Sequence, residues 1–220
     1  MARSGTAGIK GDDATPDRAT RRTTRKEFRR QSILDAAAEE FADFGYERAT
    51  LERIGERVGL SKASLYYYVS GKEQLFAELA ERFVDGVEMP VRASIDRGED
   101  AVAALSAIVR GHMTASTEPL GRALALNLHA FRSGPARLQG DRYERLVAEV
   151  VEAGIASGRI RLVSVRPAVK LMLGAMNGVS QWFKPDGNVS LDEVVEGIVG
   201  VLLRGVESTP TALHGGPSVP

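Results

Sequence analysis

The chain has 220 residues and a formal net charge of zero, because 29 lysines and arginines balance 29 aspartates and glutamates. It contains no cysteine, which excludes a disulfide framework and a thiolate metal site. No apolar run is long enough to span a bilayer, and the N-terminus lacks the hydrophobic core of a signal peptide. We therefore expect a soluble cytoplasmic protein with one large or two small compact units.

Basic side chains are concentrated near the N-terminus. Residues 17–30 hold seven basic residues and two acidic ones. Residues 1–23 offer little that could be buried, which predicts a disordered basic arm. A short charge run is usually a solvated tail, but this one could also follow the backbone or enter the minor groove of DNA. The candidate contacts within it are Arg21, Arg22 and Arg25.

The first two helices are predicted from capping and stop signals. Thr24 and Glu27 have the spacing of a capping box, and Gly45 is expected to stop the helix that they open. Apolar or small residues then recur at helical spacing and predict a second helix with one inner face; they are Leu51, Ile54, Gly55 and Val58. Gly59 is expected to end this helix, since glycine takes the left-handed conformation without steric cost.

A third short helix follows, and the segment 50–75 as a whole has the pattern of a helix–turn–helix. Ser61 is expected to cap the third helix, while Leu65 and Val69 pack inward. In a helix–turn–helix the N-terminal residues of the second helix contact base edges in the major groove. Lys62 can donate to guanine or phosphate, and Ser61 and Ser64 can bond base edges or phosphates.

This segment resembles the DNA-binding part of the TetR-type transcriptional regulators. The resemblance is carried by Ile54-Gly55, Val58-Gly59-Leu60-Ser61, Ser64-Leu65-Tyr66-Tyr67-Tyr68-Val69 and Lys72-Glu73-Gln74-Leu75. It implies phosphate contacts for Tyr66, Tyr68 and Lys72, with Thr50 as a further candidate. Tyr67 is expected to pack between helices. Gly55 stands where these regulators usually have alanine, which should cost the helix about 0.5–1 kcal/mol.

The rest of the chain is predicted to be helical. Capping boxes at Ser70/Glu73 and Ser190/Glu193 are expected to open the fourth helix and the last one, and Pro90 to break or kink the fourth. The helices between are expected at about 100–117, 120–133, 137–157 and 166–183, and the last helix at about 190–206. The predicted fold is all-α, with a three-helix DNA-binding domain at 24–72, a helical regulatory and dimerisation domain at 73–206, and a disordered tail at 207–220.

The last two predicted helices have wide apolar faces. Such faces can form an internal core, or an isologous dimer interface in which two helices from each subunit make a four-helix bundle. Gly174 and Gly178 would let another helix approach closely. The TetR resemblance implies the dimer, with the following residues at its interface: Leu171, Ala175, Val179, Leu191, Val194, Val195, Ile198 and Leu202.

Two stretches resemble the acyl-CoA-responsive members of the same family. One is residues 141–159, with Asp141-Arg142-Tyr143-Glu144, and the other is residues 174–187. An acyl-CoA needs an apolar tunnel for its chain and basic residues for its phosphates, for which Arg110, Arg132, Arg137 and Arg142 are available. The resemblance and the apolar character of these helices predict the following pocket residues: Met113, Leu128, Phe131, Arg132, Met176, Asn177 and Trp182. Each could instead be an ordinary core or surface residue.

The sequence has no nucleophile elbow, phosphate-binding loop or HExxH motif. Its three histidines are scattered, and we expect no enzyme activity, no metal and no cofactor. The predicted function is a homodimeric repressor that binds palindromic operator DNA and is released by an acyl-CoA or a similar hydrophobic effector. Two alternatives are a regulator that responds to a drug or another small metabolite, and an architectural DNA-binding protein without a ligand.

Overall fold

The computed structural model describes residues 18–161, 164–179, 182–184 and 186–206, with the side chains of 18–24 and 202–206 outside the description. The described residues form ten helices and no β-strand, which confirms the all-α prediction. The helices are α1 (Arg18–Arg48), α2 (Leu51–Arg57), α3 (Lys62–Leu65), α4 (Lys72–Asp96), α5 (Ala101–Thr117), α6 (Pro119–Leu126), α7 (Leu128–Phe131), α8 (Arg137–Ala156), α9 (Val165–Val179) and α10 (Leu191–Val206). The predicted tail, and the predicted arm as far as residue 17, lie outside the described residues.

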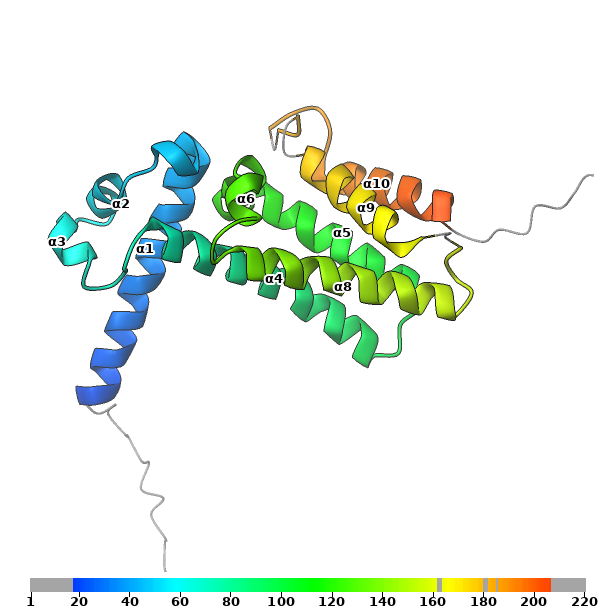
Figure 1. Ribbon diagram of the computed structural model, residues 1–220, viewed down its shortest axis with the longest axis horizontal. Coiled ribbons are helices and arrows are strands. Elements are labelled where there is room, and N and C mark those ends of the chain that lie inside the picture. The colour runs from blue at the N-terminus through cyan, green and yellow to red at the C-terminus, as the bar shows by residue number, and fades with distance from the viewer. Residues whose placement is uncertain (1–17, 162–163, 180–181, 185, 207–220) are drawn as a thin grey trace, which may run out of the picture.

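The helices form a small head and a larger body, which α4 connects (Figure 1). The head consists of α1, α2 and α3, with the start of α4 packed against α1. In the body α4 lies along α5 and α8, while α9 and α10 pack against each other and against α5. The head meets the body a second time where α1 packs against α6. None of the described helices is long and apolar enough to cross a membrane.

The first helix begins earlier than predicted and is kinked near its end. α1 starts at Arg18, so the prediction that Thr24 and Glu27 open it is wrong, and residues 18–23 are helical rather than disordered. No glycine or proline lies between Arg18 and Thr24, and arginine is a good helix former. At the other end Gly45 has φ 75°, a conformation that favours glycine. The predicted stop at Gly45 is present as a kink.

The fourth helix differs from its prediction at both ends. Ser70 pairs with Gln74 instead of Glu73, because Gln74 Oε1 accepts from the Ser70 backbone N–H at 2.7 Å and from its hydroxyl at 2.8 Å. α4 also continues through Pro90 to Asp96. A proline leaves the carbonyl four residues earlier, here that of Gly86, without its helical partner. Both Gly86 and Pro90 are exposed, so water can bond this carbonyl and the helix does not end.

The predicted body helices are present, with two changes. The helix expected at 120–133 is divided at Asn127 (φ −122°, ψ 41°) into α6 and α7. The helix expected at 166–183 ends at Val179. The capping box before α10 is confirmed, because Ser190 N donates to Glu193 Oε2 at 2.8 Å and Glu193 N donates to Ser190 Oγ at 3.2 Å.

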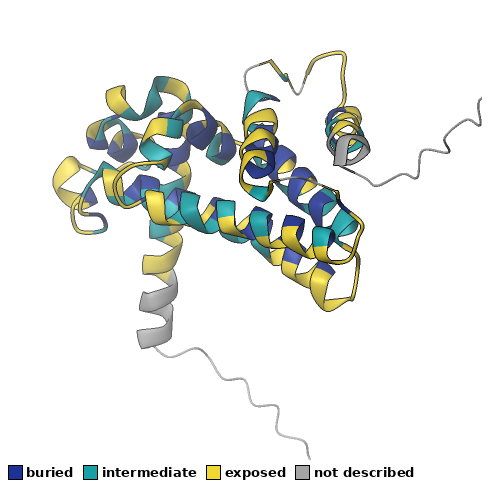
Figure 2. Cartoon of the chain, turned by 45° about the vertical axis from the view of Figure 1, so that its right-hand side comes forward, coloured by how far each residue is buried: buried dark blue, intermediate teal, exposed yellow. Residues whose placement is uncertain are grey.

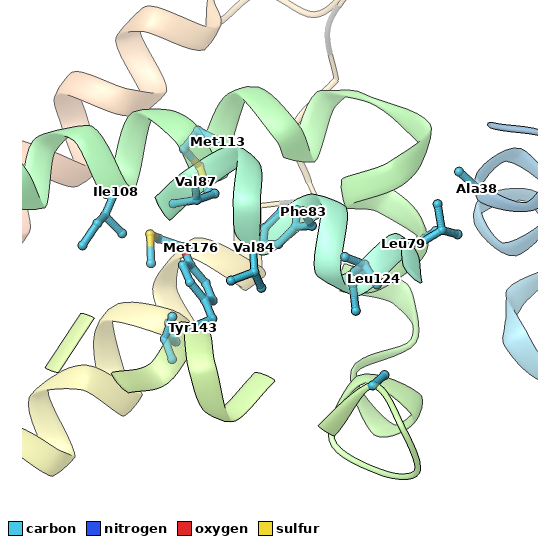
Figure 3. Close-up of a cluster of buried hydrophobic side chains, with 14 of the residues drawn as sticks. Ala38, Leu79, Phe83, Val84, Val87, Ile108, Met113, Leu124, Tyr143 and Met176 are labelled. Atoms are coloured by element: carbon cyan, nitrogen blue, oxygen red, sulfur yellow. The ribbon is translucent and has the colours of Figure 1, made fainter. Parts of the chain in front are cut away.

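One continuous apolar core runs from the head into the body (Figure 2). In the head, the rings of Phe41, Tyr46 and Phe76 pack with centroids 5.1–5.6 Å apart and join α1 to α4. Figure 3 shows the continuation in the body, where α4 supplies Phe83 and Val87 to the cluster of buried side chains. Because such interiors are close-packed and transmit strain, the core can relay a displacement from one part to the other.

Candidate DNA-binding surface and ligand cavity

The turn between α2 and α3 has the geometry that the sequence predicts. Gly59 adopts φ 68°, and Ser61 caps α3 by accepting a 3.2 Å hydrogen bond from Ser64 N. Leu65 and Val69 are buried at 0% and 3% exposure, which confirms that they pack inward. The hydroxyls of Ser61 and Ser64 are 2.9 Å apart and both residues are exposed. The element therefore presents the N-terminal end of α3 to solvent.

Gly55 has a role in this turn that the sequence does not reveal. Its carbonyl accepts a 2.8 Å hydrogen bond from Leu60 N, which closes the turn. A Cβ at Gly55 would lie 2.7 Å from the carbonyl oxygen of Leu60. That separation is too short for a carbon–oxygen contact, so an alanine here would force the turn to shift. The absence of a side chain at Gly55 therefore allows the Leu60 carbonyl to approach closely. This benefit offsets the lower helix propensity of glycine.

The three tyrosines after α3 do not lie as predicted. Tyr66 and Tyr67 are 52% and 69% exposed, whereas Tyr68 is half-buried and packs against the core. The prediction that Tyr67 packs between helices is therefore wrong. It assumed helical periodicity as far as Tyr68, but α3 ends at Leu65 and a turn follows. Tyr67 also lies beneath the ammonium of Lys26, 5.8 Å from its ring centroid. The exposed pair at this surface is Tyr66 and Tyr67.

Lys62 is held by an acidic neighbour on α2. It forms an ion pair with Glu52, and both side chains are about half exposed. The hydrogen bond from Lys62 lowers the pKa of Glu52 and raises the pKa of Lys62. Exposed ion pairs are weak and screened by salt, so a phosphate or a guanine edge can compete with Glu52 for this ammonium. Lys62 is the first residue of α3, so its cation lies at the start of the helix that is predicted to enter the major groove.

Two arginines of α1 hold the helix–turn–helix in place. Arg30 Nη1 donates to the carbonyl of Tyr68 at 2.6 Å, and its other nitrogen pairs with Glu78 on α4. Arg29 Nη1 donates to the carbonyl of Val58 at 3.3 Å. In the sequence these arginines are indistinguishable from the rest of the basic run. Only the packing of α1 against the turn separates these positioning residues from possible DNA contacts.

The remaining predicted DNA contacts lie outside α3, and some of them already bind groups within the head. Lys72 Nζ donates to the carbonyls of Tyr46 and Glu47 at 2.9 and 3.2 Å, so its ammonium binds the end of α1. Thr50 caps α2, its hydroxyl accepting from Arg53 N at 3.3 Å. Arg25 is exposed. Arg21 and Arg22 lie on α1, with side chains outside the description.

The body contains a partly open cavity of about 200 Å³ among α4 to α9. Four of the predicted pocket residues line it, namely Leu128, Phe131, Arg132 and Asn177. The prediction is wrong for three others. Met113 and Met176 are 1% exposed and belong to the core, and neither lines this cavity. Met176 lines a separate, smaller apolar pocket with Leu105 and Ile108. Trp182 follows the end of α9 and is 58% exposed.

A polar pair in the cavity wall was not expected from the sequence. His112 Nδ1 lies 2.9 Å from the hydroxyl of Tyr143, and both residues are buried. The ring of Phe83 packs edge-on against each of them, and all three line the cavity. Burial lowers the pKa of His112 to about 4 and raises the pKa of Tyr143. The pair is therefore neutral at pH 7, and the interior of the cavity carries no charge from it.

Charged side chains also line the same cavity. Lys170 Nζ pairs with Glu144 at 2.6 Å, and Arg137 Nε with Asp141 at 3.4 Å; all four residues line the cavity with Arg132. The other two arginines proposed for the phosphates lie elsewhere. Arg110 pairs with acidic residues of α10 and Arg142 with acidic residues of α4.

An apolar face of α9 and α10 remains uncovered in the single chain. Leu171 and Val201 are each 72% exposed, and a Cβ at Gly174 would meet no atom within 4 Å. Of the residues predicted at a dimer interface, Ala175 is exposed and Leu191 and Ile198 are half-buried, while the side chain of Leu202 is outside the description. Three others are buried within the chain, so they do not face a partner: Val179, Val194 and Val195.

Two sequence families match the chain, one for each part of the structure. The family described as bacterial regulatory proteins, tetR family, matches residues 33–79. The family described as tetracyclin repressor-like, C-terminal domain, matches residues 98–206. The first match covers most of the head with the start of α4. The second begins just after α4 and covers the rest of the body to the end of α10.

Several known regulators are similar to this chain over most of its length. The HTH-type transcriptional repressor KstR2 of Rhodococcus jostii is 27% identical over 197 residues, which are 84% of this chain and 95% of that protein. The HTH-type transcriptional activator FasR of Mycolicibacterium smegmatis is 26% identical over 192 residues, 84% of this chain and 86% of FasR. AibR, solved in complex with isovaleryl coenzyme A and operator DNA, has a TM-score of 0.69 and 27% identity, covering 80% of this chain and 98% of AibR. From these matches and the fold, the chain belongs to the TetR family of bacterial regulatory proteins.

Proposed function

We propose that this protein is a homodimeric transcriptional repressor that binds palindromic operator DNA and is released by an acyl-CoA. The observation that carries the proposal is the combination of two sites in one chain. The helix–turn–helix presents the start of α3 at one end, and the body contains a cavity of about 200 Å³. Such a cavity favours a regulator that binds a ligand over an architectural DNA-binding protein without one. On this view residues 24–72 bind DNA and residues 73–206 regulate and dimerise.

The DNA contacts are proposed for the exposed side chains around α3. Ser61, Lys62 and Ser64 are placed for the major groove, as in other helix–turn–helix proteins. Tyr66 and Tyr67 would bond phosphates beside it. Tyr68 and Lys72 are engaged inside the head, so their contribution would be to hold the element rather than to contact phosphate. Arg21, Arg22 and Arg25, as part of an extended α1, would follow the DNA backbone.

The dimer is proposed through the uncovered face of α9 and α10. Leu171, Gly174 and Ala175 on α9, together with Gly197 and Val201 on α10, are exposed and small or apolar. An isologous contact between two such faces buries them and fixes the distance between the two recognition helices. A palindromic operator with a defined half-site spacing follows from that symmetry.

The effector is proposed to be a short acyl-CoA. The neutral pair of His112 and Tyr143 adds no charge to the cavity, and Arg132 also lines it. Arg137 and Lys170 could bind phosphates in exchange for their present partners, Asp141 and Glu144. AibR, one of the similar structures, was solved with isovaleryl coenzyme A. By linkage, the effector weakens DNA binding by the same factor as DNA weakens effector binding. A tenfold release needs about 1.4 kcal/mol of differential affinity.

The test is fluorescence anisotropy on an operator chosen by selection from random DNA, with and without isovaleryl-CoA. Specific binding that the acyl-CoA reverses supports the proposed DNA-binding function and the proposed effector. Specific binding that is indifferent to the acyl-CoA removes the effector and retains the DNA-binding function. In vitro transcription from the same operator, with and without the protein, distinguishes a repressor from an activator. This test is needed because one relative, FasR, is a transcriptional activator.

A further inference from the structure

Asn127 lies where the chain breaks between α6 and α7, and its side chain reaches into the head. Its Oδ1 accepts a hydrogen bond from the backbone N–H of Tyr46 at 2.6 Å. Its Nδ2 donates to the carbonyl of Ala123 in α6 at 2.6 Å, and to the carbonyl of Phe41 in α1 at 3.4 Å. Phe41 and Tyr46 flank the kink at Gly45. One amide therefore joins the end of α6 to both sides of the kink in α1.

These bonds are needed because both helices are interrupted at this point. In a continuous α1 the N–H of Tyr46 would bond the carbonyl four residues earlier, but Gly45 is not helical. At the end of α6, Asn127 N bonds the carbonyl of Leu124 at 3.2 Å instead of that of Ala123. The Asn127 side chain satisfies the donor left by one interruption and the acceptor left by the other. Leaving partly buried groups of this kind unpaired is costly.

On its body side Asn127 lies between residues that line the cavity, although it does not line the cavity itself. Leu124 and Ala125 immediately before it line the cavity, and so do Leu128 and Phe131 after it. A ligand that fills the cavity presses on the residues to either side of Asn127. A shift of these residues would displace the backbone at Asn127, and the hydrogen bonds of Asn127 to α1 would oppose that displacement.

On its head side Asn127 binds the segment that leads into the helix–turn–helix. The carbonyl of Tyr46 accepts from Lys72 at the start of α4, and the ring of Tyr46 packs on Phe76 of the same helix. Thr50, the cap of α2, follows Tyr46 closely in the chain. A displacement of Tyr46 is therefore passed on to the start of α4 and to α2.

We propose that Asn127 is the positioning residue that couples occupancy of the cavity to the orientation of the DNA-binding head. This inference rests on the proposed function, and it names the route by which the two sites affect each other. α4 provides a second connection, but it passes through the core. The Asn127 amide is a polar link between the cavity wall and the kinked end of α1.

The coupling is measurable from the DNA side, without knowledge of the effector, because it is reciprocal. Amide hydrogen exchange of the wild-type dimer is compared with and without selected operator DNA, and the readout is the segment 119–131. We expect operator binding to change exchange there by about tenfold, the factor that about 1.4 kcal/mol of coupling produces. The variants are Asn127→Ala, which removes all three bonds, and Asn127→Asp, which keeps the acceptor for Tyr46 N and loses both donors. Asn188→Ala, at an exposed asparagine, is the matched control.

In both Asn127 variants the operator-induced change in residues 119–131 should fall below about twofold, while Asn188→Ala keeps the wild-type change. Operator affinity of Asn127→Asp without any ligand should stay within a few-fold of wild type, which separates lost coupling from a misfolded head. An unchanged response in Asn127→Asp, or no response in the wild type, overturns the inference and leaves the proposed DNA-binding function intact. Failure of the wild type to bind any selected DNA overturns the proposed function and this inference with it.

Discussion

The size of the cavity predicts which acyl chains this protein accepts. A cavity of about 150 Å³ holds a benzene molecule, so the 200 Å³ available here admits roughly eight non-hydrogen atoms. Each methylene that finds apolar space contributes about 0.8 kcal/mol, or about a fourfold gain in affinity. Affinity for straight-chain acyl-CoAs should therefore rise about fourfold per carbon up to about six to eight carbons, and fall beyond that length.

Phe131→Ala should move this limit. Phe131 is half-buried against the core and lines the cavity, and its truncation removes a ring of six carbons. The cavity then gains roughly the space of a benzene molecule, and the preferred chain should lengthen by about three to six carbons. Phe28→Ala is the matched control, since Phe28 is 75% exposed on α1 and should leave the preference unchanged.

The assay is isothermal titration calorimetry with acyl-CoAs from two to sixteen carbons, followed by operator release with the same series. A wild-type optimum at sixteen carbons would refute the size argument. So would a Phe131→Ala variant that binds more weakly at every length and keeps the same optimum, because the ring would then support the fold without limiting the chain.

Three further predictions concern the turn at Gly55, the exposed side chains around α3 and the buried His112. Gly55→Ala should lower the free energy of unfolding by up to about 2 kcal/mol in urea titrations, because overpacking costs about 1–3 kcal/mol and alanine returns about 1 kcal/mol of helix propensity; a more stable variant would show that the turn at Leu60 relaxes freely. Glu52→Gln should strengthen DNA binding at low salt by releasing Lys62, while Lys62→Ala and Tyr66→Phe should weaken it without unfolding the protein; anisotropy at several salt concentrations, with melting temperatures alongside, contradicts this if the affinities do not change. Because the pKa of His112 is lowered from 6.5 to about 4 in the folded protein, the unfolded chain binds more protons between these values, so stability should fall by up to about 1.4 kcal/mol per pH unit as the pH decreases from 6.5 to 4. His112→Gln should remove that part of the slope, and equal slopes in the two proteins would mean that His112 is accessible to protons in the folded state.

Local chemistry determined those features that the sequence predicts correctly. Gly59 and Ser61 act on their own turn, Gly45 interrupts its own helix, and Ser190 with Glu193 closes its own cap. Each depends on the conformational freedom or hydrogen bonding of neighbours within four residues. Hydrophobic spacing likewise predicts that the body is helical, because it reports an apolar face whatever that face packs against.

Only the tertiary structure decided which residues each helix face packs against. The sequence cannot distinguish Val194 and Val195, which are buried in the chain, from Val201, which is exposed. It cannot assign Arg30 to Tyr68, Lys72 to Tyr46 or His112 to Tyr143, and it contains no sign that Asn127 would bridge two interrupted helices. Apart from the bond of Asn127 to Ala123, these contacts join residues that lie from 26 to 81 positions apart. At such separations local propensity carries no information, because the chain is brought together by burial of its core rather than by its neighbouring residues.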